Sequence, residues 1–245
     1  MIEILLGFII GFLAAFVGVI TGSGGLVSMG YLLLAGLPFA TAIATNRVAS
    51  LGATASGLFT YGRAGKVDWK LGLLLAGPAF FGSLIGANLL VLVNERVAEL
   101  ILASFLIVLI PLIFFNKKLG IEEFEPSNNR QIVGVILYFC FGILAGMFGV
   151  GVGTISIVII AGIFGRSLSK AAATNMVAWL LVSLAALTVF VANNLINYAV
   201  ALPMMAGMFV GGYLGAKLAI KKGDRFIRIL LLVIQVLVVI RLLFF

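Results

Sequence analysis

Two short motifs in an otherwise apolar chain each occur twice, 129 residues apart. Gly22-Ser23-Gly24-Gly25 aligns with Gly151-Val152-Gly153-Thr154, and Thr45-Asn46 aligns with Thr174-Asn175. Glycines let a helix unwind and expose backbone N–H groups, and the helix that follows presents the positive end of its dipole. Thr and Asn add hydrogen-bonding side chains. This pattern predicts a binding site for a small anion, and the structural alternative is close helix packing or a simple turn.

Arg47 follows the first Thr-Asn pair and is the one cation that lies within an apolar segment, whereas Met176 takes the matching position in the second copy. A charge inside a membrane costs roughly 2.5 to 3.5 kcal/mol on insertion scales. No acidic residue lies in a segment core, which leaves an anionic ligand, backbone carbonyls or water as partners. The bland alternative is a side chain that snorkels to the interface. The candidate substrate-binding residues are Gly22, Ser23, Gly24, Gly25, Thr45, Asn46, Arg47, Gly151, Gly153, Thr154, Thr174 and Asn175.

The composition is typical of a membrane protein. Of the 245 residues, 63% are hydrophobic and 10% are charged, against roughly a quarter charged in soluble domains. Apolar runs near the length of a membrane span recur along the whole chain, which predicts an all-α polytopic membrane protein with the lipid bilayer as a partner. The net charge of +8 then reflects basic cytoplasmic loops, and no nucleic-acid partner is expected.

Each half of the chain divides into five apolar segments. The first transmembrane repeat covers residues 1–115, a polar cytoplasmic linker covers 116–130, and the second repeat covers 131–245. The second segment of each half is short or broken, because it follows a glycine cluster and has only about 13 residues. Ten spans in two repeats are one interpretation, and eight spans plus two re-entrant segments are the alternative. The segments are expected at roughly 4–20, 25–38, 41–62, 70–93, 97–115, 131–149, 153–165, 168–192, 195–219 and 226–245.

The loop charges favour two repeats inserted in opposite orientations. The loop after the third segment carries Arg63, Lys66 and Lys70 in the first half but only asparagines in the second, and the next loop reverses this pattern. Ten crossings that begin outside place thirteen of the sixteen Lys and Arg residues on one face. The positive-inside rule therefore predicts an inverted repeat with both termini outside. The N-terminus lacks a positive n-region, so we expect no cleaved signal peptide.

Several kinds of chemistry lack the residues they need. The chain has no histidine, and its only aspartates, Asp68 and Asp224, lie in loops. A Ser/His or paired-Asp protease site and a transition-metal site are therefore not expected. The glycine clusters lack the context of a nucleotide-binding motif. We expect neither an enzyme nor a cofactor.

The chain resembles the TauE/SafE sulfite exporter family along essentially its whole length. In the first half the match lies in the break at Gly22–Gly25, in Gly36-Leu37-Pro38 and in the run from Ala44 to Ser50. It continues through residues 61–69 and 82–87, and in the second half through residues 173–175, 211–216 and 221–228. Family members are commonly described with seven or eight spans, whereas the charges here favour ten.

The resemblance implies a permease of the prokaryotic inner membrane. Such a protein moves a small anionic substrate that contains sulfur, such as sulfite or an organosulfonate, in the outward direction. The residues and the resemblance both favour a secondary transporter that works by alternating access. An anion channel, a transporter of another small anion or organic acid, and a membrane scaffold without transport are the alternatives.

Overall fold

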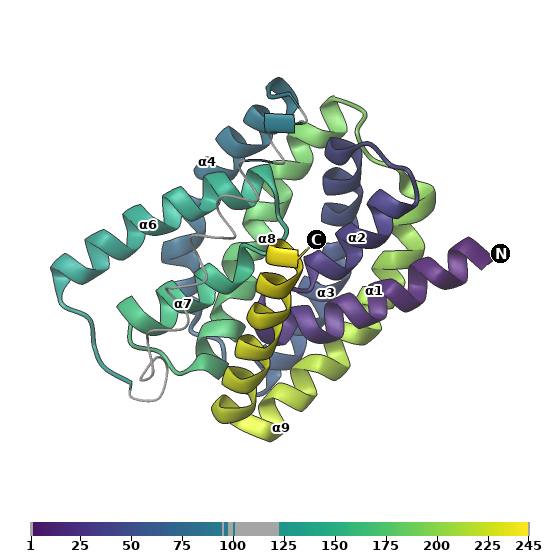
Figure 1. Cartoon of the computed structure of the whole chain (residues 1–245). Coiled ribbons are helices and arrows are strands. Elements are labelled where there is room, and N and C mark those ends of the chain that lie inside the picture. Colours follow the sequence, from purple (N-terminus) through teal and green to yellow (C-terminus); the bar gives the residue numbers. More distant parts are fainter. Residues whose placement is uncertain (1, 95, 98–99, 101–122, 245) are drawn as a thin grey trace.

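The computed structural model describes residues 2–94, 96–97, 100 and 123–244, and all regular structure in this part is helical (Figure 1). The predicted segment 97–115 and the linker before residue 123 fall almost entirely outside the described residues. The other predicted segments match helices within a few residues. The helices are α1 (Ile2–Thr21), α2 (Gly25–Leu34), α3 (Phe39–Arg63), α4 (Trp69–Leu92), α6 (Asn128–Met147), α7 (Gly153–Ile163), α8 (Leu168–Ala192) and α9 (Tyr198–Phe244).

Five of the described helices are long and apolar enough to cross a membrane, which confirms a polytopic helical membrane protein. They are α1, α4, α6, α8 and the part of α9 up to Leu231. Helix α3 has 25 residues but is less hydrophobic, because it carries Thr45, Asn46, Arg47 and further hydroxyl side chains, most of them buried. Helices α2 and α7 have 10 and 11 residues. At 1.5 Å per residue they are too short to cross a hydrocarbon core of about 30 Å.

Helices α3, α4, α8 and the first part of α9 run between two ends of the molecule. At one end, which we call the neutral end, Pro38, Leu90, Val93 and Leu195 line a common cavity. At the opposite, charged end, Arg166 Nε donates to Asp68 Oδ2 at 3.0 Å. The four helices therefore alternate in direction.

Ion pairs and a capping contact hold the loops of the charged end together. Lys170 Nζ donates to Glu123 Oε2 at 2.8 Å, and this bond holds the pKa of Glu123 below its usual value. Asp224 Oδ1 accepts hydrogen bonds from the backbone N–H and the hydroxyl of Ser169. This contact anchors the break in α9 at Gly223 (φ 75°, ψ −172°) beside the start of α8.

Two helical hairpins enter the molecule from opposite ends. Helix α2 begins beside the Gly22–Gly25 break in the interior and leads to the neutral end. Helix α6 follows the linker at the charged end, and α7 returns to that end before Arg166. The hairpin tips meet in the interior, where a Cβ on Gly153 would lie 2.5 Å from the Gly22 carbonyl oxygen.

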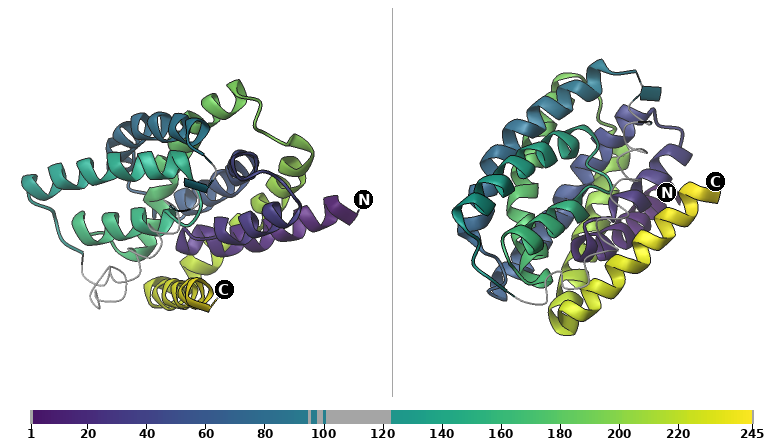
Figure 2. Two further views of the ribbon diagram at one scale, coloured as in Figure 1. Left: turned by 45° about the horizontal axis from the view of Figure 1, so that its top comes forward. Right: turned by 60° about the vertical axis from the view of Figure 1, so that its left-hand side comes forward.

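Each hairpin packs against the long helix of the other half. Helix α1 lies along α9, and α6 lies along α4. Glycines make these approaches close: a Cβ on Gly82 or Gly86 would collide with the backbone of α6, and one on Gly211 or Gly215 with that of α1. The purple helices α1 and α2 accordingly lie to one side of the molecule and the teal helices α6 and α7 to the other (Figures 1 and 2).

Candidate functional site

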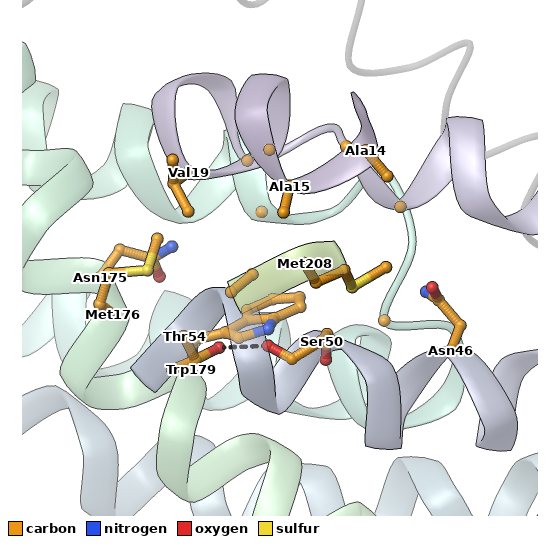
Figure 3. Close-up of a pocket in the computed structure, with 17 residues that line it drawn as sticks. Ala14, Ala15, Val19, Asn46, Ser50, Thr54, Asn175, Met176, Trp179 and Met208 are labelled. Atoms are coloured by element: carbon orange, nitrogen blue, oxygen red, sulfur yellow. Dashed lines mark hydrogen bonds between the residues drawn. The ribbon is translucent and has the colours of Figure 1, made fainter. Parts of the chain in front are cut away.

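A cavity of about 70 Å³ lies where the two hairpin tips meet α1, α3 and α8 (Figure 3). About 10 to 15 Å³ of such volume is enough for one water molecule, so the cavity has room for a compact anion. No carboxylate lines it. The lining residues are Ala14, Ala15, Gly18, Val19, Gly22, Gly24, Gly25, Asn46, Ser50, Ala53, Thr54, Gly149, Gly153, Asn175, Met176, Trp179 and Met208.

The two glycine breaks touch each other directly at this cavity. Ser23 Oγ lies 2.5 Å from Thr154 Oγ1, and Thr154 Oγ1 also lies 2.7 Å from the Thr21 carbonyl oxygen. Helix α2 starts at Gly25 and α7 starts at Gly153, so both helices direct the positive ends of their dipoles toward the contact. The predicted convergence of the two breaks is therefore present in the structure.

Asn46 and Asn175 lie at opposite ends of the cavity (Figure 3). Asn46 Oδ1 accepts a hydrogen bond from Ser28 at 2.6 Å, and Asn175 Oδ1 accepts one from the Tyr138 hydroxyl at 3.1 Å. Both amide oxygens are thereby engaged. Neither amide nitrogen makes a hydrogen bond within the described part of the chain, so both N–H₂ groups are available as donors to an anion.

The threonines of the two Thr-Asn pairs contact the helices that follow the loops of the opposite half. Thr45 Oγ1 accepts from the backbone N–H of Asn197 at 3.0 Å, and Thr174 Oγ1 accepts from that of Asp68 at the same distance. These two bonds are equivalent under the shift of 129 residues. Thr45 and Thr174 therefore position the starts of α9 and α4, and neither lines the cavity.

Arg47 is buried, with 2% of its surface exposed, and does not snorkel to an interface. Its Nη2 donates to the carbonyl oxygen of Ala145, and its guanidinium carbon lies 5.3 Å from the centroid of the Trp179 ring. Nη1 has no hydrogen-bond partner among the described residues. Arg47 lies behind Gly149 and Trp179, which form the cavity wall on this side.

The structure thus sorts the predicted site residues into groups. Gly22, Gly24, Gly25, Asn46, Gly153 and Asn175 line the cavity. Ser23 and Thr154 join the hairpin tips, Thr45 and Thr174 hold loops, and Arg47 lies one layer behind the wall. Gly151 lies in the turn before α7 and does not line the cavity.

Sequence reasoning missed Ser50, Thr54 and Trp179. Ser50 and Thr54 follow Asn46 at intervals of four residues, which is the spacing of one helix face. Trp179 follows Asn175 by the same interval and aligns with Ser50 under the shift of 129 residues. Extending the Asn pair by one helical turn would have found these residues. Ser28 and Tyr138, which orient the two amides, have apolar partners in the other copy and left no such signal.

Comparison with known proteins identifies relatives over nearly the whole chain. A probable membrane transporter protein of Haemophilus influenzae is 32% identical over 222 residues, which cover 90% of this chain and 87% of the relative. The probable membrane transporter protein YfcA of Escherichia coli K12 is 29% identical over 238 residues, which cover 97% and 88% of the two chains. The probable membrane transporter protein YdhB of Bacillus subtilis is 26% identical over 222 residues, which cover 89% of each chain.

No solved structure matches the chain significantly. Residues 6–242 match the family described as sulfite exporter TauE/SafE, a range that includes both glycine breaks, both Thr-Asn pairs and the cavity between them. The expected resemblance is confirmed. The chain therefore belongs to the TauE/SafE sulfite exporter family of membrane transporters.

Proposed function

We propose that the protein is a secondary transporter that exports a small sulfur-containing anion, such as sulfite or an organosulfonate, from a prokaryotic cell across its inner membrane. The cavity between the two hairpin tips is the substrate site. The observation that carries this proposal is the set of donors around the cavity, where two free amide groups and two helix N-termini converge with no carboxylate in the lining.

The lining also suits an anion that has an apolar part. Val19, Met176, Trp179 and Met208 surround the space between the two amides. A sulfonate group would accept hydrogen bonds from the amides and from the backbone N–H groups of the breaks, while a short carbon chain would contact these side chains. The same lining would admit sulfite alone or a small organic acid, and a substrate panel separates these cases.

Alternating access by two inverted repeats is supported by the equivalence of contacts in the two halves. The bond between Thr45 and Asn197 matches the one between Thr174 and Asp68, and the packing of α1 on α9 matches that of α6 on α4. A hairpin returns to the face where it entered. The loops therefore keep their predicted sides whether α1 and α2 count as two crossings or as one re-entrant hairpin.

Flux in proteoliposomes tests the transport function. Sulfite, ethanesulfonate, sulfate and acetate are offered to the purified protein with and without a proton gradient. A transporter gives saturable flux that is stimulated by substrate on the opposite side, whereas a channel gives flux without such counter-flow. Absence of both flux and anion binding for the whole panel would leave the scaffold alternative.

We expect Asn46→Ala and Asn175→Ala each to weaken anion binding. Each removes one donor to a charged ligand, which corresponds to about 1.5 to 3 kcal/mol, or roughly 10- to 100-fold in Kd. Calorimetric titration of the purified variants measures this. Asn88→Ala is the control, because Asn88 is an exposed residue of α4 that donates only to the Leu84 carbonyl. Wild-type affinity in both cavity variants would remove the amides from the site.

The proposed orientation is tested by the accessibility of single cysteines in a Cys140→Ser background. We expect a membrane-impermeant maleimide to label Asn193→Cys, at the neutral end, in intact cells. Lys66→Cys, at the charged end, should react only after the membrane is permeabilised. The opposite pattern would reverse the orientation, and equal labelling of both positions would contradict the division into two faces.

A further inference from the structure

The two halves differ at the point where the site needs a charge. Arg47 and Met176 are equivalent positions, yet only Arg47 can supply a cation. It belongs to the first half but reaches the hairpin of the second half, where it binds the backbone of α6 and lies against Gly149. No ion pair joins Arg47 to a carboxylate in the described part of the chain.

The partner of Arg47 is the carbonyl end of a helix. Ala145 lies in the last turn of α6, which ends at Met147, and its carbonyl oxygen accepts from Nη2. The last carbonyls of a helix carry partial negative charge and attract cations. In broken-helix transporters such carbonyls bind a coupling cation. Here a side chain of the same protein occupies this place.

We propose that Arg47 is a tethered counter-cation of the α6–α7 break, which supplies the positive charge that retains an anion in the neighbouring cavity without touching it. This inference rests on the proposed function. Gly149 and Trp179 each have one face on the guanidinium and line the cavity, so the charge lies one side-chain layer from the substrate. Gly149 has no side chain, and a Cβ there would collide with the guanidinium carbon and nitrogens.

The unpartnered Nη1 is consistent with this role. A guanidinium that served only to cap α6 would have its remaining donors satisfied by other carbonyls, because unpaired buried donors are costly. Arg47 instead keeps one N–H₂ group without a hydrogen bond in the described structure, beside a ring face that favours a cation. The excess positive charge is thus available to a substrate.

The test replaces Arg47 with the residue of the other half. Arg47→Met gives both copies the same side chain at this position, and Arg47→Gln keeps a donor without the charge. Two unit charges about 7 Å apart at an effective dielectric constant near 20 correspond to about a 50-fold change in Kd. We therefore expect both variants to raise the Kd for sulfite and ethanesulfonate by about tenfold or more. Arg63→Gln is the control, since Arg63 is exposed at the end of the same helix and its loss should change Kd by less than about twofold.

Chemical complementation separates a charge from a purely structural role. Arg47→Ala should bind the anions as weakly as Arg47→Met, and millimolar guanidinium chloride should restore most of the lost affinity, whereas equal sodium chloride should not. Wild-type Kd in the Met and Gln variants would overturn the proposal. A lowered Tm without any recovery in guanidinium would also overturn it, in favour of a structural role. If the wild-type protein binds none of the anions, the proposed function fails instead.

Discussion

Replacing Gly22 with alanine is expected to abolish anion binding and flux and to lower the Tm of the purified protein. Gly22 has φ +74°, a conformation that costs a residue with a side chain about 1 to 3 kcal/mol. The added Cβ would also lie 2.6 Å from the backbone nitrogen of Thr154 and closer still to the carbonyl carbon of Gly153. Since both contacts are with backbone, the two hairpin tips must separate, and the donors around the cavity then lose their convergence.

Gly36→Ala separates the contact from the strain. Gly36 has φ +81°, and a Cβ there would meet nothing within 4 Å. We expect this variant to lower the Tm by an amount that reflects backbone strain alone while it keeps the wild-type Kd for the anions. Calorimetric titration and thermal unfolding of both variants measure the two effects. Equal loss of binding in Gly22→Ala and Gly36→Ala would contradict a site formed by contact of the hairpin tips.

Local sequence patterns determine most of the helices. The segment predicted at 168–192 coincides with α8, and the third and fourth segments match α3 and α4 within two residues. Continuous apolar runs and the glycine or proline residues between them contain this information. The last two predicted segments lie together in α9, whose break at Gly223 was expected from the charged residues around it.

The packing between the halves could not be derived from periodicity. The two glycine breaks, Asn46 and Asn175 were found because the same pattern occurs twice, and the structure brings them to one cavity. The role of Thr45 and Thr174 depends instead on which loop lies beside each hydroxyl, which is a property of the tertiary fold. The same holds for Arg47: its place in an apolar segment indicated a buried charge, but only the fold identifies Ala145 and Trp179 as its neighbours.

The exchange of long helices between the halves makes the two repeats dependent on each other. Helix α4 belongs to the first repeat, yet it packs mainly on α6 and α8 of the second, and α9 packs in the same way on α1 and α3. A repeat expressed alone would therefore expose the faces of its hairpin that the other half covers. The glycines of α4 and α9 are the residues that hold this arrangement together.

Gly86→Ala is expected to destabilise the whole protein through the contact between α4 and α6. A Cβ on Gly86 would collide with the carbonyl oxygen of Ile143 and lie 2.8 Å from the backbone nitrogen of Met147. Because neither atom belongs to a flexible side chain, the helix axes must move apart. Overpacking of this kind costs about 1 to 3 kcal/mol and lowers the Tm by several degrees. The displacement also moves α6 and with it the Ala145 carbonyl that binds Arg47, so anion affinity should fall together with stability.

Gly77→Ala is the matched control, since it adds the same methyl group to the same helix where nothing lies within 4 Å. The better helix propensity of alanine should leave the Tm unchanged or raise it slightly. Opposite shifts of Tm in Gly77→Ala and Gly86→Ala, measured in the same detergent, would establish that the second repeat depends on this face of α4. Equal shifts would mean that α4 does not approach α6 so closely, and the dependence of each repeat on the other would then have to rest on α9 alone.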